Sequence, residues 1–249
     1  MKDEVVMITG AGRGLGRAYA LASAKLGARV ALCDLDLGSA REVEGDIGRS
    51  GGRSVAIQVD VADPESVEAA VAAVAGELGP PSVLINNAAK FADLPMRPFD
   101  AIPLDEWRQV MAVNVTGAFL CTRAVAPFMI EQKRGKVINV SSSTVWTGRP
   151  GYLHYVTSKS ALIGMTRALA NELGPHGITV NAVTPGATRT EIERSTMSED
   201  RWTQVAAQTA LGRYAVPDDI VGVVLFLASR GSDFMTGQIL NVDGGRSFP

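Results

Sequence analysis

The stretch Val5–Gly16, VVMITGAGRGLG, decides the fold class of this chain. Its β-branched and apolar beginning predicts a buried strand, and the glycines that follow predict a tight turn. Beyond the turn an apolar stripe predicts an amphipathic helix. The stripe consists of Leu15, Tyr19, Ala22 and Leu26. A strand, a glycine-rich turn and a helix in this order form the first unit of a parallel sheet whose helix N-terminus can bind an anion.

Short β-branched runs continue to alternate with helical stretches along the chain. Further strands are predicted at 29–34, 54–61, 82–89, 136–141, 178–185 and 237–242. A long helical region is predicted from Leu104 to about Lys133, bent near Pro127, and the proline-containing stretch 89–103 before it is expected to border the active site. No linker divides the chain. The pattern therefore predicts one domain, residues 1–249, built as a Rossmann-like doubly wound α/β fold with about seven parallel strands and helices on both faces.

Composition narrows the classes of partner. The chain has 249 residues, 46% of them hydrophobic and 20% charged, with a net charge of -2. This is typical of a soluble globular protein with no basic excess for nucleic acid or for an anionic membrane, so a small-molecule partner is expected. Cys33 and Cys121 lie in apolar stretches, and with only two histidines they suggest neither a disulfide framework nor a metal site. No signal peptide or membrane span is indicated, and a cytoplasmic location is expected.

The segment Ser142–Lys159, SSTVWTGRPGYLHYVTSK, carries a candidate catalytic pattern. Tyr155 and Lys159 are four residues apart, which places both side chains on one face of a helix. A free phenol titrates at about 10, and a nearby ammonium lowers that pKa, so Tyr155 could exchange a proton with an alcohol or ketone. A hydroxyl from Ser142, thirteen residues before the tyrosine, could hold the reacting oxygen. Such pairs also occur on ordinary surface helices, so this pattern indicates catalysis only together with the other motifs of the chain.

The glycine-rich turn and the strand ends that follow predict a dinucleotide site. Backbone N–H groups in Thr9–Gly16 can approach a pyrophosphate closely. Asp34 ends the second predicted strand, where an acid binds the ribose hydroxyls of NAD and repels the 2′-phosphate of NADP. Arg13 argues in the other direction, because a guanidinium in this turn can pair with a 2′-phosphate. We expect NAD to be preferred, with Asp60 and Val61 at the adenine edge.

In order and spacing these motifs resemble the short-chain dehydrogenase/reductase superfamily of the classical type, over essentially the whole chain. TGAGRGLG is similar to the family's TGxxxGxG, and NNAA at 86–89 is similar to its NNAG with Ala89 in place of the glycine. The resemblance implies a catalytic set of Asn114, Ser142, Tyr155 and Lys159, in which the asparagine holds a water on a proton-relay path. The cofactor site implied by the resemblance and by the turn comprises Gly10, Arg13, Gly14, Leu15, Gly16, Asp34, Asp60, Val61, Asn87, Ala88, Tyr155, Lys159, Pro185, Gly186, Thr188 and Thr190.

The resemblance also implies the reaction. Hydride would pass between NAD(H) and a secondary alcohol or ketone, with Tyr155 as general acid and base. Candidate substrate-pocket residues are Ser142, Thr144, Trp146, Tyr152 and Ala187. This partly aromatic set favours a ring or a hydrophobic arm on the substrate, with residues 190–213 as a lid above it. The C-terminal GQILNVDGG resembles the segment that family members use to assemble homotetramers.

Two other functions stay open. An NADPH-dependent ketoreductase of the 3-oxoacyl type is kept open by Arg13 and opposed by Asp34. A non-catalytic dinucleotide-binding sensor on the same fold is opposed by the complete set of Ser142, Tyr155 and Lys159, which a protein that only binds does not require.

Overall fold

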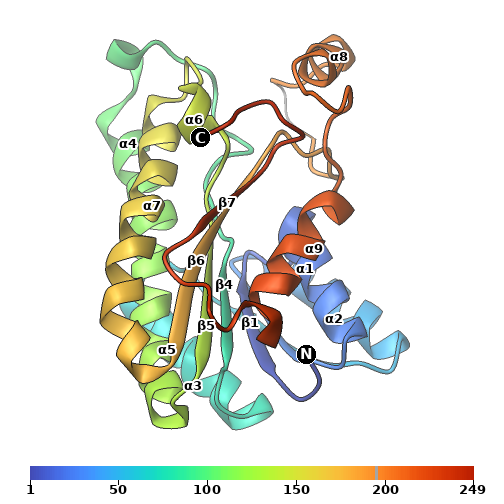
Figure 1. Cartoon of the computed structure of the whole chain (residues 1–249), viewed down its shortest axis with the longest axis vertical. Helices are drawn as coiled ribbons and strands as arrows, with labels where there is room; N and C mark the ends of the chain where they lie inside the picture. The colour runs from blue at the N-terminus through green and yellow to red at the C-terminus, as the bar shows by residue number, and fades with distance from the viewer. Residues whose placement is uncertain (194–195) are drawn as a thin grey trace.

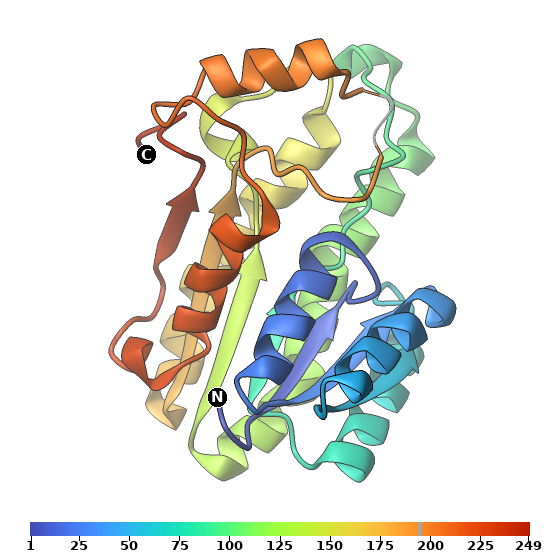
Figure 2. The same cartoon turned by 90° about the vertical axis from the view of Figure 1, so that its right-hand side faces the viewer.

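The computed structural model describes residues 1–193 and 196–249. Seven parallel strands form one sheet in the order β3-β2-β1-β4-β5-β6-β7 (Figures 1 and 2). The strands are β1 (Val5–Thr9), β2 (Arg29–Asp34), β3 (Arg53–Gln58), β4 (Val83–Asn86), β5 (Gly135–Val140), β6 (Ile178–Pro185) and β7 (Ile239–Val242). The predicted fold class is confirmed. The strand order reverses between β1 and β4, which is where sheets of this kind bind ligands.

Helices cover both faces of the sheet. The α-helices among the described residues are α1 (Gly14–Lys25), α2 (Leu37–Arg49), α3 (Pro64–Leu78), α4 (Leu104–Met111), α5 (Gly117–Gln132), α6 (Thr144–Thr147), α7 (Leu153–Leu173), α8 (Glu199–Ala207) and α9 (Pro217–Leu227). Short helical turns are η1 (Phe99–Ala101), η2 (Ala112–Thr116), η3 (Gly174–His176) and η4 (Arg230–Ser232). In Figure 1, α3, α5 and α7 lie on one side of the sheet and α1, α2 and α9 on the other. Figure 2 shows α8 beyond the carboxyl ends of the strands.

The two faces of β1 show how the sequence builds this core. Val5 and Met7 pack into the cluster formed with α3 and α5, whereas Val6 and Ile8 pack into the cluster formed with α1, α2 and α9. All four side chains are buried. A strand covered on both faces reads as a continuous apolar run, and this is why VVMIT shows no polar alternation.

Helix α1 follows its predicted stripe except at the end. Tyr19 is buried, and Leu15 and Ala22 are partly buried against the same cluster. Leu26 lies just beyond the helix and is 49% exposed. At the other end the helix passes so close to the glycine turn that a Cβ on Gly16 would overlap the carbonyl oxygen of Gly10.

The predicted long helix near 104–133 is interrupted earlier than expected. Its hydrogen bonding changes to a π-helical turn at η2, Ala112–Thr116, whereas Pro127 lies inside α5. By length and composition alone Leu104–Gln132 is also the one helix among the described residues that could cross a membrane. Its α5 half is instead a core helix, since Leu120, Val125 and Met129 are buried in the cluster between α3 and the sheet.

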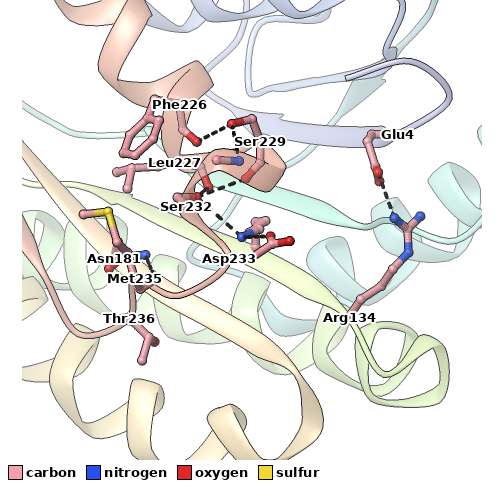
Figure 3. Close-up of polar contacts among 12 residues, drawn as sticks. Glu4, Arg134, Asn181, Phe226, Leu227, Ser229, Ser232, Asp233, Met235 and Thr236 are labelled. Atoms are coloured by element: carbon pink, nitrogen blue, oxygen red, sulfur yellow. Dashed lines mark hydrogen bonds and ion pairs between the residues drawn. The ribbon is translucent and has the colours of Figure 1, made fainter.

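Polar contacts fix the sheet ends opposite the site (Figure 3). The Asn181 side-chain amide on β6 donates to the carbonyl oxygen of Met235, 2.8 Å away, and so holds the turn that leads into β7. Glu4, just before β1, pairs with Arg134 at 2.8 Å. These contacts tie the connection before β7 to β6, and the residue before β1 to the residue before β5.

Candidate active site

A cavity of about 750 Å³ lies at the carboxyl ends of the strands, where the strand order reverses. It brings together most of the residues predicted from the sequence. Those lining it are Gly10, Arg13, Gly14, Leu15, Asp34, Asp60, Val61, Asn87, Ala88, Ser142, Thr144, Tyr155, Lys159, Pro185, Gly186, Ala187, Thr188 and Thr190. Four predicted residues do not line it: Gly16, Asn114, Trp146 and Tyr152.

The glycine turn is held in shape by Asn87. Gly10 and Gly14 have φ angles of 65° and 58°, in the left-handed region that favours glycine. The side-chain amide of Asn87 donates to the carbonyl oxygens of Thr9 and Gly10, both at 3.0 Å, and its backbone N–H donates to the Thr9 hydroxyl at 3.0 Å. Gly16 acts behind the turn by letting α1 approach it. Asn87 of the NNAA motif, just after β4, therefore holds the glycine turn that follows the neighbouring strand β1.

Asp34 closes one end of the cavity. One carboxylate oxygen accepts a hydrogen bond from the backbone N–H of Gly12 at 2.8 Å, and the other accepts from the N–H of Asp36 at 3.0 Å. These bonds hold the carboxylate on the cavity wall, where its remaining lone pairs can accept from hydroxyl groups. Arg13 lines the same end, and so does Asp60.

Tyr155, Lys159 and Ser142 converge on one wall. Tyr155 and Lys159 lie one turn apart on α7 and are 7% and 2% exposed. The Lys159 ammonium lies 5.8 Å from the centre of the Tyr155 ring and donates to the carbonyl oxygen of Val140 at 2.8 Å. Burial lowers the pKa of Lys159 to about 8. The Ser142 hydroxyl oxygen accepts from the Thr144 hydroxyl at 2.9 Å, which orients it at the end of β5.

Asn114 lies behind this wall, in the π-helical turn. Its side-chain oxygen accepts from the backbone N–H of Lys90 at 2.7 Å, and its amide donates to the Ser158 hydroxyl at 3.0 Å. Ser158 in turn donates to the carbonyl oxygen of Tyr155 at 2.7 Å. Asn114 thus connects the loop after β4 with the turn of α7 that bears the tyrosine and the lysine.

Trp146 and Tyr152 do not line the cavity, contrary to expectation. The Trp146 indole N–H donates to the Thr184 hydroxyl on β6 at 3.2 Å. Tyr152 is 1% exposed and its hydroxyl donates to the Thr196 hydroxyl at 3.1 Å. Each polar tip is bound to a neighbouring segment, and the Tyr152 ring packs against Phe91 with the centroids 5.5 Å apart.

Phe91 lines the cavity, whereas the predicted aromatic residues Trp146 and Tyr152 do not. Its ring stacks on Tyr155 with the centroids 4.1 Å apart and the planes 24° from parallel, and it lines the cavity. The proline-containing stretch 89–103 was expected to border the site, but it has no periodicity from which the direction of one side chain could be read.

Charged residues outside the predicted set also line the cavity. Lys90 pairs with Asp93 at 2.8 Å, and Arg149 and Arg246 contribute further positive charge. Within residues 1–193 and 196–249, no group of three or more His, Cys, Asp or Glu side chains lies close enough to hold a metal ion. The polar groups that Tyr155, Lys159, Ser142 and Thr144 bring to the cavity are a phenol, an ammonium and two hydroxyls.

Comparisons with known proteins agree with this arrangement. A family model described as enoyl-(acyl carrier protein) reductase matches residues 10–247. The chain is 36% identical to a 3-oxoacyl-[acyl-carrier-protein] reductase of Synechocystis sp., with 97% of this chain and 96% of the relative covered. It is 38% identical to a cyclohexanol dehydrogenase of Rhodococcus sp., with 100% and 97% covered.

A solved structure, that of a 3-ketoacyl-(acyl-carrier-protein) reductase from Brucella melitensis complexed with NADH, superimposes with a TM-score of 0.92 at 32% identity. The superposition covers 99% of each chain. With its fold, its glycine turn and its tyrosine–lysine pair, the chain belongs to the short-chain dehydrogenase/reductase superfamily of oxidoreductases.

Proposed function

We propose that this protein is an NAD-preferring dehydrogenase that interconverts a secondary alcohol and the corresponding ketone. One observation carries the proposal: Tyr155, Lys159 and Ser142 line the same cavity as the glycine turn and Asp34. A proton-transfer group and a dinucleotide site that share one cavity can act on the same alcohol group. The proton then leaves the hydroxyl oxygen, and the hydride leaves the carbon that bears it.

The residues of the turn fit a dinucleotide. Gly10 and Gly14 have no Cβ that would keep a pyrophosphate away from the backbone, and Gly14 is the first residue of α1. A helix N-terminus of this kind favours a pyrophosphate. The Asp34 carboxylate is placed to accept hydrogen bonds from ribose hydroxyls, and Asp60 and Val61 border the same end. A bound nicotinamide would accept or donate the hydride.

The chain's own residues would handle the proton. In the oxidising direction Tyr155 takes the hydroxyl proton of the alcohol, and in the reducing direction it returns a proton to the ketone oxygen. Lys159 stabilises the phenolate by its charge, and with a pKa of about 8 it remains mainly protonated at neutral pH. The Ser142 hydroxyl donates to the reacting oxygen. Asn114, bound to Ser158 beside the lysine, holds a water that connects Lys159 with solvent.

The tyrosine provides the first test. Tyr155→Phe should abolish turnover, because the phenyl ring cannot exchange a proton, and should leave NADH affinity largely unchanged. Tyr152→Phe is the matched control, since it removes a hydroxyl that bonds to Thr196 outside the cavity. Turnover is followed by NADH absorbance and affinity by fluorescence titration. Wild-type rates in Tyr155→Phe would refute the assignment.

The cofactor preference is tested at Asp34. Asp34→Ala should lower the NAD/NADP ratio of kcat/KM, since the variant no longer repels a 2′-phosphate. The second candidate, an NADPH-dependent ketoreductase of the 3-oxoacyl type, is favoured by Arg13 in the cavity wall and by the name of the Synechocystis relative. It predicts the reverse behaviour: the wild type prefers NADPH, and Arg13→Ala rather than Asp34→Ala changes the ratio.

The substrate we propose carries a ring or a hydrophobic arm. Phe91, stacked on Tyr155 in the cavity wall, favours an apolar group beside the reacting carbon, and Thr144 and Ala187 line the same cavity. We propose that residues 190–213 close over it. This range contains α8, and its positions 194 and 195 lie outside the described residues. A screen of alicyclic, aromatic and acyl-thioester substrates in both directions separates the candidates, and NADH binding without turnover across the panel would favour the sensor.

We further propose a cytoplasmic homotetramer. The edge strand β7 and the partly exposed Phe226 of α9 offer an apolar surface near the C-terminus, at the segment whose sequence resembles the family's assembly region. Sedimentation at micromolar concentration tests this, and a dominant monomer would refute it.

A further inference from the structure

Glu191 occupies the N-terminus of α1 from a distant part of the chain. Its carboxylate oxygen accepts a hydrogen bond from the backbone N–H of Gly14 at 2.7 Å, although the residues are 177 positions apart. The next side chain, Ile192, covers the same turn, since its Cδ1 lies 2.7 Å from where a Cβ on Gly14 would stand. The segment after β6 is therefore seated on the glycine turn.

Helix α1 has no acceptor of its own at this end. Within α1, every residue of which the structure describes, the first turn contains no acidic residue, and the N-cap residue Arg13 makes no side-chain capping hydrogen bond. The first N–H groups of a helix need partners, and the helix dipole favours an anion there. Glu191 meets both needs, which distinguishes its contact from an incidental surface hydrogen bond.

The same N–H group belongs to the turn that fits a pyrophosphate. Gly14 lines the cavity together with Thr190 and Ile192, the residues on either side of Glu191, so the carboxylate that is bonded to Gly14 lies beside the wall that a dinucleotide would contact. One N–H group cannot serve a carboxylate and a phosphate oxygen at once, and two anions at this distance repel each other.

We infer that Glu191 is an internal competitor for the cofactor's pyrophosphate, which weakens dinucleotide binding and speeds dinucleotide release. The inference rests on the proposed dinucleotide site. As the dinucleotide leaves, the carboxylate takes over the Gly14 N–H, so the helix end is never left without an acceptor. Release of product often limits turnover in enzymes, and a residue that speeds it would raise kcat at the expense of affinity.

The test compares Glu191→Gln with Glu193→Gln. The first keeps the size of the side chain and removes the charge that competes; the second removes an exposed carboxylate two residues further along. Dissociation constants are measured for NADH and for ADP-ribose, which has the pyrophosphate but no nicotinamide. We expect Glu191→Gln to lower both constants about threefold to tenfold, the size of one partly exposed charge-assisted hydrogen bond, and to slow NADH dissociation in stopped flow. Glu193→Gln should leave both constants unchanged.

A cofactor-free measurement separates the two levels of the inference. The amide resonance of Gly14 in the free protein should move in Glu191→Ala, which has no side-chain acceptor, and stay in place in Glu193→Ala. An unmoved resonance would overturn the contact. A moved resonance with unchanged or weaker NADH binding would overturn the competition while leaving the proposed function intact. If neither NADH nor NADPH binds the wild type, the proposed function fails and the competition fails with it.

Discussion

Replacing Lys159 by methionine should stabilise the unliganded protein at neutral pH while abolishing turnover. Lys159 is 2% exposed, and burial lowers the pKa of its ammonium from 10.5 to about 8. Methionine has a similar length and no charge to desolvate. The buried charge that we propose for catalysis therefore lowers the free energy of unfolding, a trade-off common at active sites.

The magnitude follows from the pKa change and one hydrogen bond. Lowering the pKa from 10.5 to about 8 corresponds to about 3 kcal/mol of lost stability at pH 7. The substitution also removes the donor to the carbonyl oxygen of Val140. A buried carbonyl left without a partner costs ~1–3 kcal/mol. The net expectation is that Lys159→Met is more stable than the wild type by about 1 kcal/mol at pH 7.

The pH dependence of stability is a more specific test of the buried Lys159 than the stability difference at pH 7. In the folded chain Lys159 holds its proton less tightly than in the unfolded chain, so between pH 8 and pH 10.5 the unfolded chain binds more protons. Wild-type stability must therefore rise with pH through this window, and the lysine's contribution grows by about 2 kcal/mol between pH 7 and pH 9.5. The variant lacks this contribution, so its advantage should vanish or reverse at the higher pH.

Urea denaturation at both pH values, without cofactor and at one protein concentration, measures the difference. Lys25→Met, which removes an exposed ammonium from α1, is the matched control, and its difference from the wild type should stay constant with pH. If the stability difference between Lys159→Met and the wild type were the same at pH 7 and pH 9.5, the lysine would not be desolvated as the structure places it.

Three further substitutions test the turn, the aromatic wall and a helix cap. Gly16→Ala should lower Tm and abolish dinucleotide binding because its Cβ would overlap the Gly10 carbonyl oxygen, whereas Gly76→Ala in α3, with no atom within 4 Å of the added Cβ, should leave Tm unchanged or raise it. Phe91→Ala should raise KM for ring-bearing substrates by about twofold to tenfold and that for short aliphatic alcohols less, since one aromatic contact contributes ~0.5–1.5 kcal/mol; equal effects on both would contradict the proposed wall. Asp63→Ala removes the acceptor for the N–H groups at the start of α3 and should cost ~1 kcal/mol in urea denaturation.

The parts of the site that local chemistry dictates were predictable. Gly10 and Gly14 are glycines because the turn needs positive φ, and that requirement is visible in the residues themselves. Asp34 ends a strand that reads as an apolar run, and its place at the carboxyl edge follows from the parallel order of the sheet. Tyr155 and Lys159 share a helix face by their spacing alone.

Other features depend on packing between distant segments, and no local pattern indicates them. The contact of Glu191 with Gly14 joins residues 177 positions apart. The π-helical turn at Ala112–Thr116 lies in a continuous helical pattern, while the proline that drew attention, Pro127, is accommodated inside α5. The closeness of α1 to the Gly10 carbonyl oxygen, which excludes a Cβ at Gly16, is not indicated by hydrophobic spacing.

Nearness in sequence to Tyr155 does not place the rings of Trp146 and Tyr152 on the cavity wall, and the reason is physical. Tyr152 precedes the first turn of α7, and both its hydroxyl and the Trp146 indole N–H reach polar partners on other segments, which fixes their rings outside the cavity. Phe91 has no polar tip to satisfy, so its ring can lie against Tyr155 in the cavity wall. The aromatic contact with Tyr155 thus comes from the loop after β4, whereas α6 follows the neighbouring strand β5. Exchanging that loop between relatives should therefore change substrate preference more than exchanging residues 144–152.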